Sequence, residues 1–315
     1  MRRTDAAGIP HGPDPVIDGV TLTRRYVRTN GIRLHLVEAG EGPQIVLLHG
    51  FPEFWYGWRR QIPFLVEAGY RVIVPDLRGY NRSDRPRGVG SYRLETIVED
   101  VVGLLAAVGA SPAVWVGHDW GGAVAWYGAM RHPEAVRRLV VLNSPHPVAL
   151  GRMLRRSPTQ LLRFTYAGFF QLPWLPEALL ANRWLLRRVL RAGPAPDDEA
   201  LTRYLEAFPD RASLSGPLNY YRAAVRRPPG AAVSITLPTL VVWGDRDPFL
   251  DARLTEGMGR GVEDLRIVHL PHAGHWLHQR NAGEVNRGIH EFLADDREEP
   301  SGQGELPPDA GPEPR

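Results

Sequence analysis

The stretch VWVGHDWGG at residues 114–122 constrains the fold of this chain more than any other part of it. A short apolar run leads to Asp119, which small residues flank, and an alanine-rich apolar segment follows at once. This order predicts a buried strand, a sharp turn and a helix. Turns of this kind usually present a serine between glycines, which let the backbone hold the central side chain above the sheet. Here the central residue is a carboxylate, so Asp119 is the candidate nucleophile.

A carboxylate at this turn narrows the reaction, because the bond that it forms must later be broken. A serine oxygen that attacks a saturated carbon leaves an ether, which water does not easily cleave, whereas a carboxylate leaves an ester. Asp119 needs no base to activate it, since the reference pKa of Asp is about 3.9. The following helix N-terminus also favours its charged form. A surface turn would give the same local pattern, but the apolar strand before it favours the nucleophile.

The composition excludes several other chemistries. With 315 residues, the chain can bury one large core and carry an inserted smaller domain. It has no cysteine, which excludes thiol nucleophiles, thiolate metal sites and disulfides. It has no lysine, which excludes a Walker-type phosphate loop and a Schiff base. The net charge is only +3, so nucleic-acid binding is not expected.

The N-terminus and the hydropathy pattern predict a location. The first residues contain no apolar core of a signal peptide. No apolar run reaches the roughly 18 residues that a membrane span needs. We therefore expect a cytoplasmic protein without a membrane span.

Alternating apolar and amphipathic segments predict an α/β protein with a mostly parallel, doubly wound sheet. Besides the strand before Asp119, strands are expected at residues 24–28, 32–38, 44–48, 71–75, 139–142, 239–243 and 266–270. The clearest amphipathic helix begins at Leu94, and a last helix is expected at residues 282–294. Ligands of such sheets bind at the carboxyl ends of the strands, where His49, Asp119 and Asn143 stand.

The pattern divides the chain into five segments. Residues 1–22 and 296–315 lack periodicity and are predicted to be flexible. Residues 23–147 and 231–295 form the two parts of the α/β core. Between them, residues 148–230 have no strand pattern, and their arginines outnumber their acids. Helices expected at residues 176–191 and 197–208 indicate that this segment is an inserted helical cap.

A carboxylate nucleophile needs a base for the second step, and the late strands are followed by candidates. Asp247 follows Gly244 by three residues, and His275 comes directly after Gly274. The order Asp119, Asp247, His275 is that of nucleophile, acid and histidine in hydrolases with this kind of sheet. An imidazole accepts a proton from water at neutral pH, and a carboxylate behind it fixes its tautomer. Asp245 is the alternative acid, but it lies nearer the strand.

Four histidines recur at intervals of three residues from His269 to His278, which raises the question of a metal site. Pro271 and Gly274 break the helix that would align them, and no carboxylate pair stands alongside. We therefore expect no metal and no cofactor. The members of this run other than His275 are interpreted as structural histidines.

Hydrolysis of the ester also needs backbone N–H groups that stabilise an oxyanion. Trp120, directly after the nucleophile, supplies one such group. Phe51, after the turn at His49 and Gly50, is expected to supply the second.

Four motifs together resemble the epoxide hydrolases of the α/β-hydrolase fold. They are HGFPE at residues 49–53, GHDWGG at 117–122, GDRD at 244–247 and GHW at 274–276. The resemblance covers about residues 24–295 and implies the α/β-hydrolase fold. It also implies two cap tyrosines that hydrogen-bond the epoxide oxygen. Tyr221 matches the second of these, and Tyr166 is the match for the first. A phenol with a pKa of about 10 stays protonated at pH 7.

The expected reaction opens an epoxide to a vicinal diol through an ester of Asp119, which water activated by His275 then hydrolyses. The expected partners are a small apolar epoxide and water, and the chain is expected to be a monomer or a homodimer. An apolar pocket is predicted from six residues: His49, Pro52, Phe54, Trp55, Phe170 and Trp174.

Two alternatives remain. Haloalkane and haloacid-type dehalogenases share the individual motifs, but they often carry Asn directly after the His-Gly turn, where this chain has Phe51. A catalytically idle receptor with a hydrolase fold is the alternative from another class. The presence of all three triad residues argues against it.

Overall fold

An eight-stranded sheet forms the centre of the molecule. The computed structural model of the chain describes residues 14–228, 230 and 233–295. The strand order is β10-β9-β8-β7-β5-β6-β4-β3, parallel from β10 to β6 and antiparallel at β4 and β3. The strands are β3 (Thr23–Thr29), β4 (Ile32–Ala39), β5 (Gln44–Leu48), β6 (Arg71–Pro75), β7 (Ala113–His118), β8 (Val136–Leu142), β9 (Thr239–Gly244) and β10 (Leu265–Leu270). The predicted mostly parallel α/β sheet is thereby confirmed.

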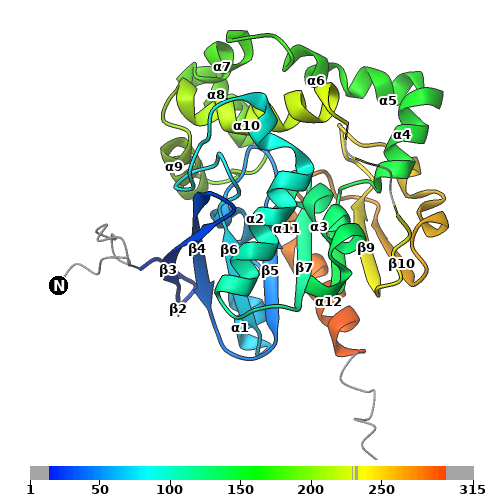
Figure 1. Cartoon of the computed structure of the whole chain (residues 1–315). Helices are drawn as coiled ribbons and strands as arrows, with labels where there is room; N and C mark the ends of the chain where they lie inside the picture. Colours follow the sequence, from blue (N-terminus) through cyan, green and yellow to red (C-terminus); the bar gives the residue numbers. More distant parts are fainter. Residues whose placement is uncertain (1–13, 229, 231–232, 296–315) are drawn as a thin grey trace, which may run out of the picture.

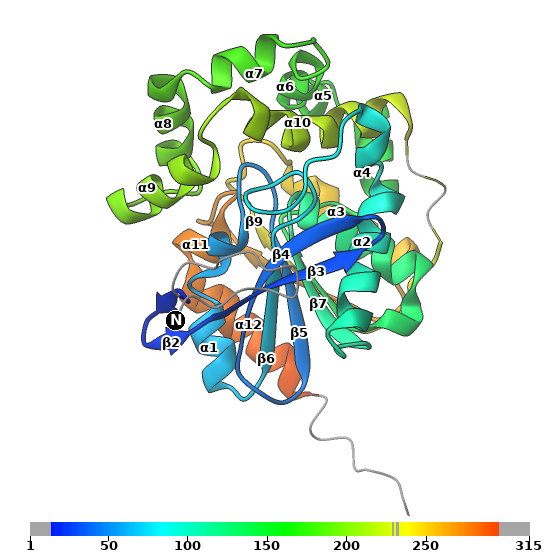
Figure 2. The same ribbon diagram turned by 60° about the vertical axis from the view of Figure 1, so that its left-hand side comes forward.

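Helices cover both faces of this sheet. Figure 2 shows α2 (Leu94–Ala107) and α3 (Trp120–Arg131) on one side, with α1 (Ile62–Glu67) and α12 (Ala282–Ala294) on the other. The central strands are apolar on both faces because both are covered, and β5 and β7 are almost wholly buried. The shorter helices of the core are η1 (Trp55–Trp58), η2 (Val89–Tyr92), η3 (Pro133–Ala135), η4 (Ala252–Thr255), η5 (Met258–Arg260) and α11 (Leu277–Arg280).

Among the described residues between β8 and β9, the chain forms seven helices, which we call the insert. They are α4 (Pro147–Arg156), α5 (Pro158–Arg163), α6 (Thr165–Phe169), α7 (Leu175–Leu180), α8 (Arg183–Ala192), α9 (Asp198–Ala207) and α10 (Arg211–Arg226). Figure 1 shows them above one end of the sheet, the end at which β5, β7 and β9 finish. Across the described ranges, no helix is both long and apolar enough to cross a membrane.

One helix expected in the insert is two helices. The sequence pattern predicts a single helix over residues 176–191, but α7 ends at Leu180 and α8 begins at Arg183. The reason is Asn182, whose side chain accepts hydrogen bonds from the amides of Trp184 and Leu185. Because Asn182 caps the start of a new helix, α7 and α8 are separate helices and not one continuous helix.

The N-terminal segment is more ordered than its composition indicates. Within residues 14–22, β1 (Val16–Ile17) and β2 (Val20–Thr21) pair antiparallel. Asp18 and Gly19 form the turn between them, both with positive φ, so a local Asp-Gly turn produces a ribbon where no structure is expected. The rest of the predicted flexible segments, residues 1–13 and 296–315, lies outside the described residues.

Candidate active site

Asp119 stands at the turn between β7 and α3 in an unusual backbone conformation, and glycines surround it where neighbouring segments approach closely. Its φ is +50° and its ψ is −117°, which is strained for a residue with a side chain. A Cβ on Gly121 would overlap the carbonyl oxygen of Leu48, and one on Gly50 would overlap the side chain of Asp119. These glycines allow neighbouring backbone to pass so close that the Asp119 side chain is held above the sheet.

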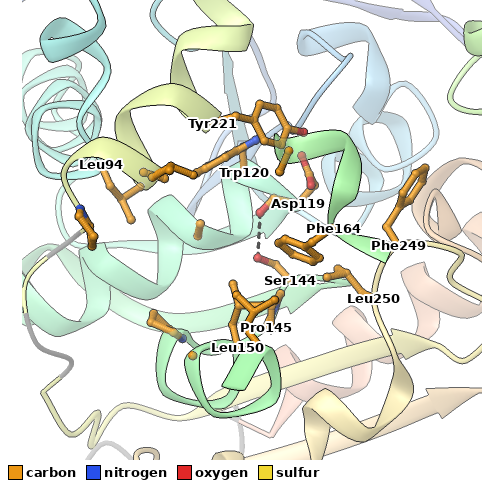
Figure 3. Close-up of a pocket in the computed structure, with 18 of the residues that line it drawn as sticks. Leu94, Asp119, Trp120, Ser144, Pro145, Leu150, Phe164, Tyr221, Phe249 and Leu250 are labelled. Carbon is orange, nitrogen blue, oxygen red and sulfur yellow. Dashed lines mark hydrogen bonds between the residues drawn. The ribbon is translucent and has the colours of Figure 1, made fainter. Parts of the chain in front are cut away.

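The two oxygens of Asp119 have different surroundings. The amide of Phe51 donates to Oδ1 at 2.8 Å, whereas Oδ2 lies 3.7 Å from Nε2 of His275. The hydroxyl of Ser144 donates to the main-chain carbonyl of Asp119 at 2.8 Å, as Figure 3 shows. One oxygen is therefore held by a backbone N–H, and the other faces the histidine.

His275 is connected to Asp247 and, through it, to Asn143. Nδ1 of His275 lies 2.6 Å from Oδ2 of Asp247, and the amide of Asn143 donates to the same oxygen at 2.6 Å. The backbone amides of Phe249 and Leu250 donate to the other oxygen of Asp247. The acid is thus fixed from both sides, and it is the predicted Asp247 rather than Asp245 that contacts His275.

The charges around His275 favour its protonated form. Burial lowers the pKa of this imidazole, but the carboxylates of Asp247 and Asp119 outweigh burial and raise the pKa to about 10. The pKa of Asp247 is lowered, since the histidine and Asn143 compensate for its burial. At this raised pKa, His275 is an imidazolium at neutral pH.

Tyr166 on α6 and Tyr221 on α10 approach the nucleophile from the insert. Their ring centroids are 5.8 Å apart, and that of Tyr221 is 5.0 Å from that of Trp120. Burial, followed by the charge of Asp119, raises the pKa of both phenols above the usual value. Both hydroxyls therefore stay protonated and can donate.

A cavity of about 610 Å³ contains these groups. Asp119, His275, Tyr166, Tyr221 and Trp120 all line it, and Figure 3 shows Asp119 between Tyr221, Phe164 and Ser144. Most of the remaining wall is apolar, and its members include Leu94, Ala123, Pro145, Leu150, Leu154, Phe164, Ala224, Val225, Phe249 and Leu250. A volume of this size suits a small organic molecule.

None of the six residues predicted to form the substrate pocket lines this cavity. His49 accepts from the amide of Leu77, and Pro52 is buried in the turn after Phe51. The ring of Phe54 packs on Tyr204.

The other three predicted pocket residues lie elsewhere. Trp55 is buried in η1, whereas Trp174 is 63% exposed. Phe170 packs behind Tyr166 and Tyr221. On the side of the insert, the cavity is lined instead by residues of α4, by Phe164 after α5, by α6 and by the end of α10.

The other histidines of the 269–278 run each face a carboxylate. His269 contacts Asp245, and His272 contacts Glu284. His278 is the exception in being buried, with Glu53 and His118 close by. Glu53 accepts from His118 and from the amide of Gly50, so this group forms a buried polar network that supports the turn. The interpretation of these histidines as structural agrees with these contacts.

Asn143 is the residue of the site to which the sequence reading assigned no function. It follows β8, its φ is +38°, and its carboxamide contacts both Asp247 and Gly244. A polar residue directly after a buried parallel strand was the available signal, and the same signal applies to Ser144.

Known proteins resemble this chain over most of its length. The model of the alpha/beta hydrolase fold family matches residues 43–282. The AB hydrolase superfamily protein YfhM of Bacillus subtilis is 41% identical over 88% of this chain and 99% of its own length. Human epoxide hydrolase 4 is 38% identical over 91% of this chain and 83% of its own length. The chain belongs to the epoxide hydrolases of the α/β-hydrolase fold.

A solved structure of the same family supports this membership. The epoxide hydrolase of Bacillus megaterium, solved in complex with an inhibitor, superimposes with a TM-score of 0.80 at 29% identity. The match covers 85% of this chain and 99% of that one. The resemblance seen in the four sequence motifs is thereby confirmed.

Proposed function

We propose that this protein hydrolyses an epoxide to a vicinal diol through a covalent ester of Asp119. The observation that supports this most directly is the shared cavity, which is lined by the carboxylate of Asp119, by two phenols and by a histidine paired with a second carboxylate. The carboxylate attacks carbon, the phenols meet the oxygen that leaves carbon, and the histidine serves the later hydrolysis. The insert acts as a cap that supplies the phenols and excludes bulk water.

In the first step, Oδ2 of Asp119 forms a bond to an epoxide carbon while the bond from that carbon to the ring oxygen breaks. Oδ1 remains on the amide of Phe51 and becomes the ester carbonyl. The ring oxygen takes a proton from Tyr166 or Tyr221, which stay protonated because burial and the charge of Asp119 raise their pKa. The products of this step are a hydroxyalkyl ester and a phenolate.

In the second step, His275 passes the proton of its imidazolium form to the phenolate and then takes a proton from water, and the resulting hydroxide attacks the carboxyl carbon of Asp119. The negative charge develops on Oδ1, where the amide of Phe51 and that of Trp120 stabilise it. The bond from the carboxyl carbon to Oδ2 then breaks and releases the diol. The departing alkoxide takes the proton of the newly formed carboxyl group, so Asp119 is a carboxylate and His275 an imidazolium again, and one water is consumed.

Ester formation itself prepares His275 for this second step. Asp119 helps to raise the pKa of His275 to about 10, and this contribution disappears when the carboxylate becomes a neutral ester. The pKa of the imidazole falls, so it can accept a proton from water only after the nucleophile has reacted. The two steps are therefore ordered by electrostatics.

The covalent step is tested by removing the base. His275→Gln keeps a polar side chain of similar size but cannot take the proton of water, so incubation with an epoxide should leave the protein heavier by the mass of that epoxide. Intact mass and peptide mapping measure the adduct, which should lie on Asp119. The matched control is the Asp119→Asn, His275→Gln double variant, which should stay unmodified.

Labelling tests the same proposal in the unmodified enzyme. Repeated turnover in ¹⁸O water should place label in the carboxylate of Asp119, because the attacking water oxygen stays there. Turnover without label at Asp119, together with no adduct in His275→Gln, would rule out the covalent cycle. Halide release from haloalkanes in place of diol formation would support the dehalogenase alternative.

A further inference from the structure

The insert exposes large apolar side chains on the side that faces away from the sheet. Among the described residues, every exposed leucine or tryptophan lies in the insert, and we call this set the outer patch: Leu161, Leu162, Leu172, Trp174, Leu179 and Trp184. Leu162 is 70% exposed and Trp184 69% exposed. Figures 1 and 2 both show α5, α6 and α7 away from the sheet, with α10 between them and the core. No member of the outer patch lines the active-site cavity, so the patch is a separate surface.

The helices that carry the outer patch are strongly cationic. Residues 147–196, which include α4 to α8, contain eight arginines and a single acid, Glu177. Glu177 is buried and pairs with Arg222, which lies outside this stretch. The formal charge of the stretch is therefore +7, whereas that of the whole chain is +3. The rest of the chain is thus net negative, and the positive charge of the molecule is concentrated in α4 to α8.

On α8, the apolar and cationic groups share one face. Trp184, Arg187, Arg188 and Arg191 are exposed and recur at helical spacing. The guanidinium of Arg188 lies over the indole of Trp184, 5.7 Å from the ring centroid. An exposed indole among guanidinium groups is typical of a surface that meets the boundary between water and lipid, where tryptophan and arginine are both favourable.

We propose that the outer patch binds the surface of an anionic lipid bilayer. The arginines of α4 to α8 would lie at the headgroups, since each basic residue near an anionic membrane adds to the binding free energy. Trp174 and Trp184 would lie at the interface, and the exposed leucines would be buried among the first acyl carbons. This binding needs no membrane-spanning helix, and it is independent of the reaction at Asp119.

Two other occupants fit the outer patch less well. A second copy of this chain would place one cationic patch against another, and the two would repel each other. A nucleic acid would satisfy the arginines through its phosphates, but that backbone offers no apolar partner to the exposed leucines. A bilayer with anionic headgroups satisfies both kinds of side chain at once.

The test measures how the full-length protein sediments with lipid vesicles. Vesicles of phosphatidylcholine that contain about 30% phosphatidylglycerol should bind the protein at least about tenfold more tightly than vesicles of phosphatidylcholine alone. Added sodium chloride should weaken this binding, because salt screens the attraction between the arginines and the headgroups. No binding to the anionic vesicles would overturn the inference, and binding to duplex DNA in its place would identify the surface as a nucleic-acid site.

Two double variants separate the charged and the apolar contributions. Arg187→Gln with Arg188→Gln should weaken vesicle binding by about 30-fold, the scale of two basic residues near an anionic surface. Trp174→Ser with Trp184→Ser should also weaken it, and the remaining binding should depend more steeply on salt. Both variants should hydrolyse a water-soluble epoxide at the wild-type rate, which shows that they are folded, because none of the four side chains lines the cavity.

Arg266→Gln with Arg287→Gln is the matched control. It removes the same charge from exposed positions on β10 and α12 of the core, and it should leave vesicle binding within about twofold of wild type, since those positions lie outside the insert. An equal loss of binding in this control and in the α8 variant would show a general effect of net charge and would overturn the assignment to the outer patch.

Discussion

Burial serves a chemical purpose at the two tyrosines. A phenol can donate a hydrogen bond to the leaving oxygen only while it keeps its proton. Burial, with the charge of Asp119, raises the pKa of Tyr166 and Tyr221 above the usual value near 10. Both phenols therefore lose their protons at a higher pH than free tyrosine does. In the proposed cycle, the charge of the attacking carboxylate therefore also keeps the two hydrogen-bond donors protonated.

We predict that Tyr221→Phe lowers kcat/KM by about 10²-fold, the lower end for loss of a general acid. In the wild-type enzyme, kcat/KM should not fall through pH 10, because the raised pKa of both phenols moves the basic limb higher. Steady-state assays of diol formation across pH measure both. Tyr127→Phe is the control, since Tyr127 lines the cavity but donates to the carbonyl of Gly230. An equal loss in both variants would argue against a donor at Tyr221.

At the scale of the element, one arginine holds the parts of the insert that carry the tyrosines. Arg222 on α10 is buried and donates to both oxygens of Glu177 on α7. It also donates to the carbonyls of Phe170 and Leu172 in the connection between α6 and α7. Since Tyr221 precedes Arg222 and Tyr166 lies in α6, this one side chain fixes the positions of both phenols.

Arg222→Met should lower the free energy of unfolding by about 3–5 kcal/mol, because Glu177 is left buried without its partner. Urea denaturation measures the change, and the exposed Arg226 of the same helix, substituted in the same way, should have little effect. Arg222 lowers the pKa of Glu177 against the effect of burial. The contribution of the Arg222–Glu177 ion pair to the free energy of unfolding is therefore present above the ordinary pKa of Glu near 4.3 and is lost as pH falls below it. A difference between wild type and Arg222→Met that stays constant from pH 6 to pH 3 would contradict this account.

The sequence predicted the parts of the site that depend on local signals. Asp119, Asp247 and His275 each follow a strand of the parallel part of the sheet, and the carboxyl ends of parallel strands converge, so their meeting follows from the sheet. The wall of the cavity depends instead on how helices of the insert pack. The aromatic residues near the HGFPE motif were expected there, but the core takes them, as the contact of Phe54 with Tyr204 shows. No periodicity in the sequence indicates which face of α4 meets Asp119.

At the scale of the whole molecule, the insert meets the core at a contact between two glycines. A Cβ on Gly216 of α10 would lie 2.7 Å from the Cα of Gly79, which follows β6. Gly79 itself has a φ of +87°, and Tyr220 donates to the carbonyl of the preceding residue, Arg78. Tyr221 is only five residues from Gly216, so this contact sets the distance between the phenol and the sheet.

Gly216→Ala should therefore separate α10 from the core. We expect a loss of about 1–3 kcal/mol in stability and a fall in kcat/KM, measured by thermal unfolding and by diol formation. Gly168→Ala is the control, because a Cβ on Gly168 of α6 meets nothing within 4 Å and alanine favours a helix. A Gly216→Ala protein as stable and active as the control would show that the contact is not needed.

In the proposed cycle, the groups that form the ester precede β9 in the chain, and the pair that activates water for its cleavage follows β9. Asp119 and both tyrosines precede β9, whereas Asp247 and His275 follow it. Damage confined to the last strands and their loops would spare the alkylation step and abolish the release step. Such a molecule would scavenge one toxic electrophile and then stay blocked, a sacrificial trap in place of a catalyst.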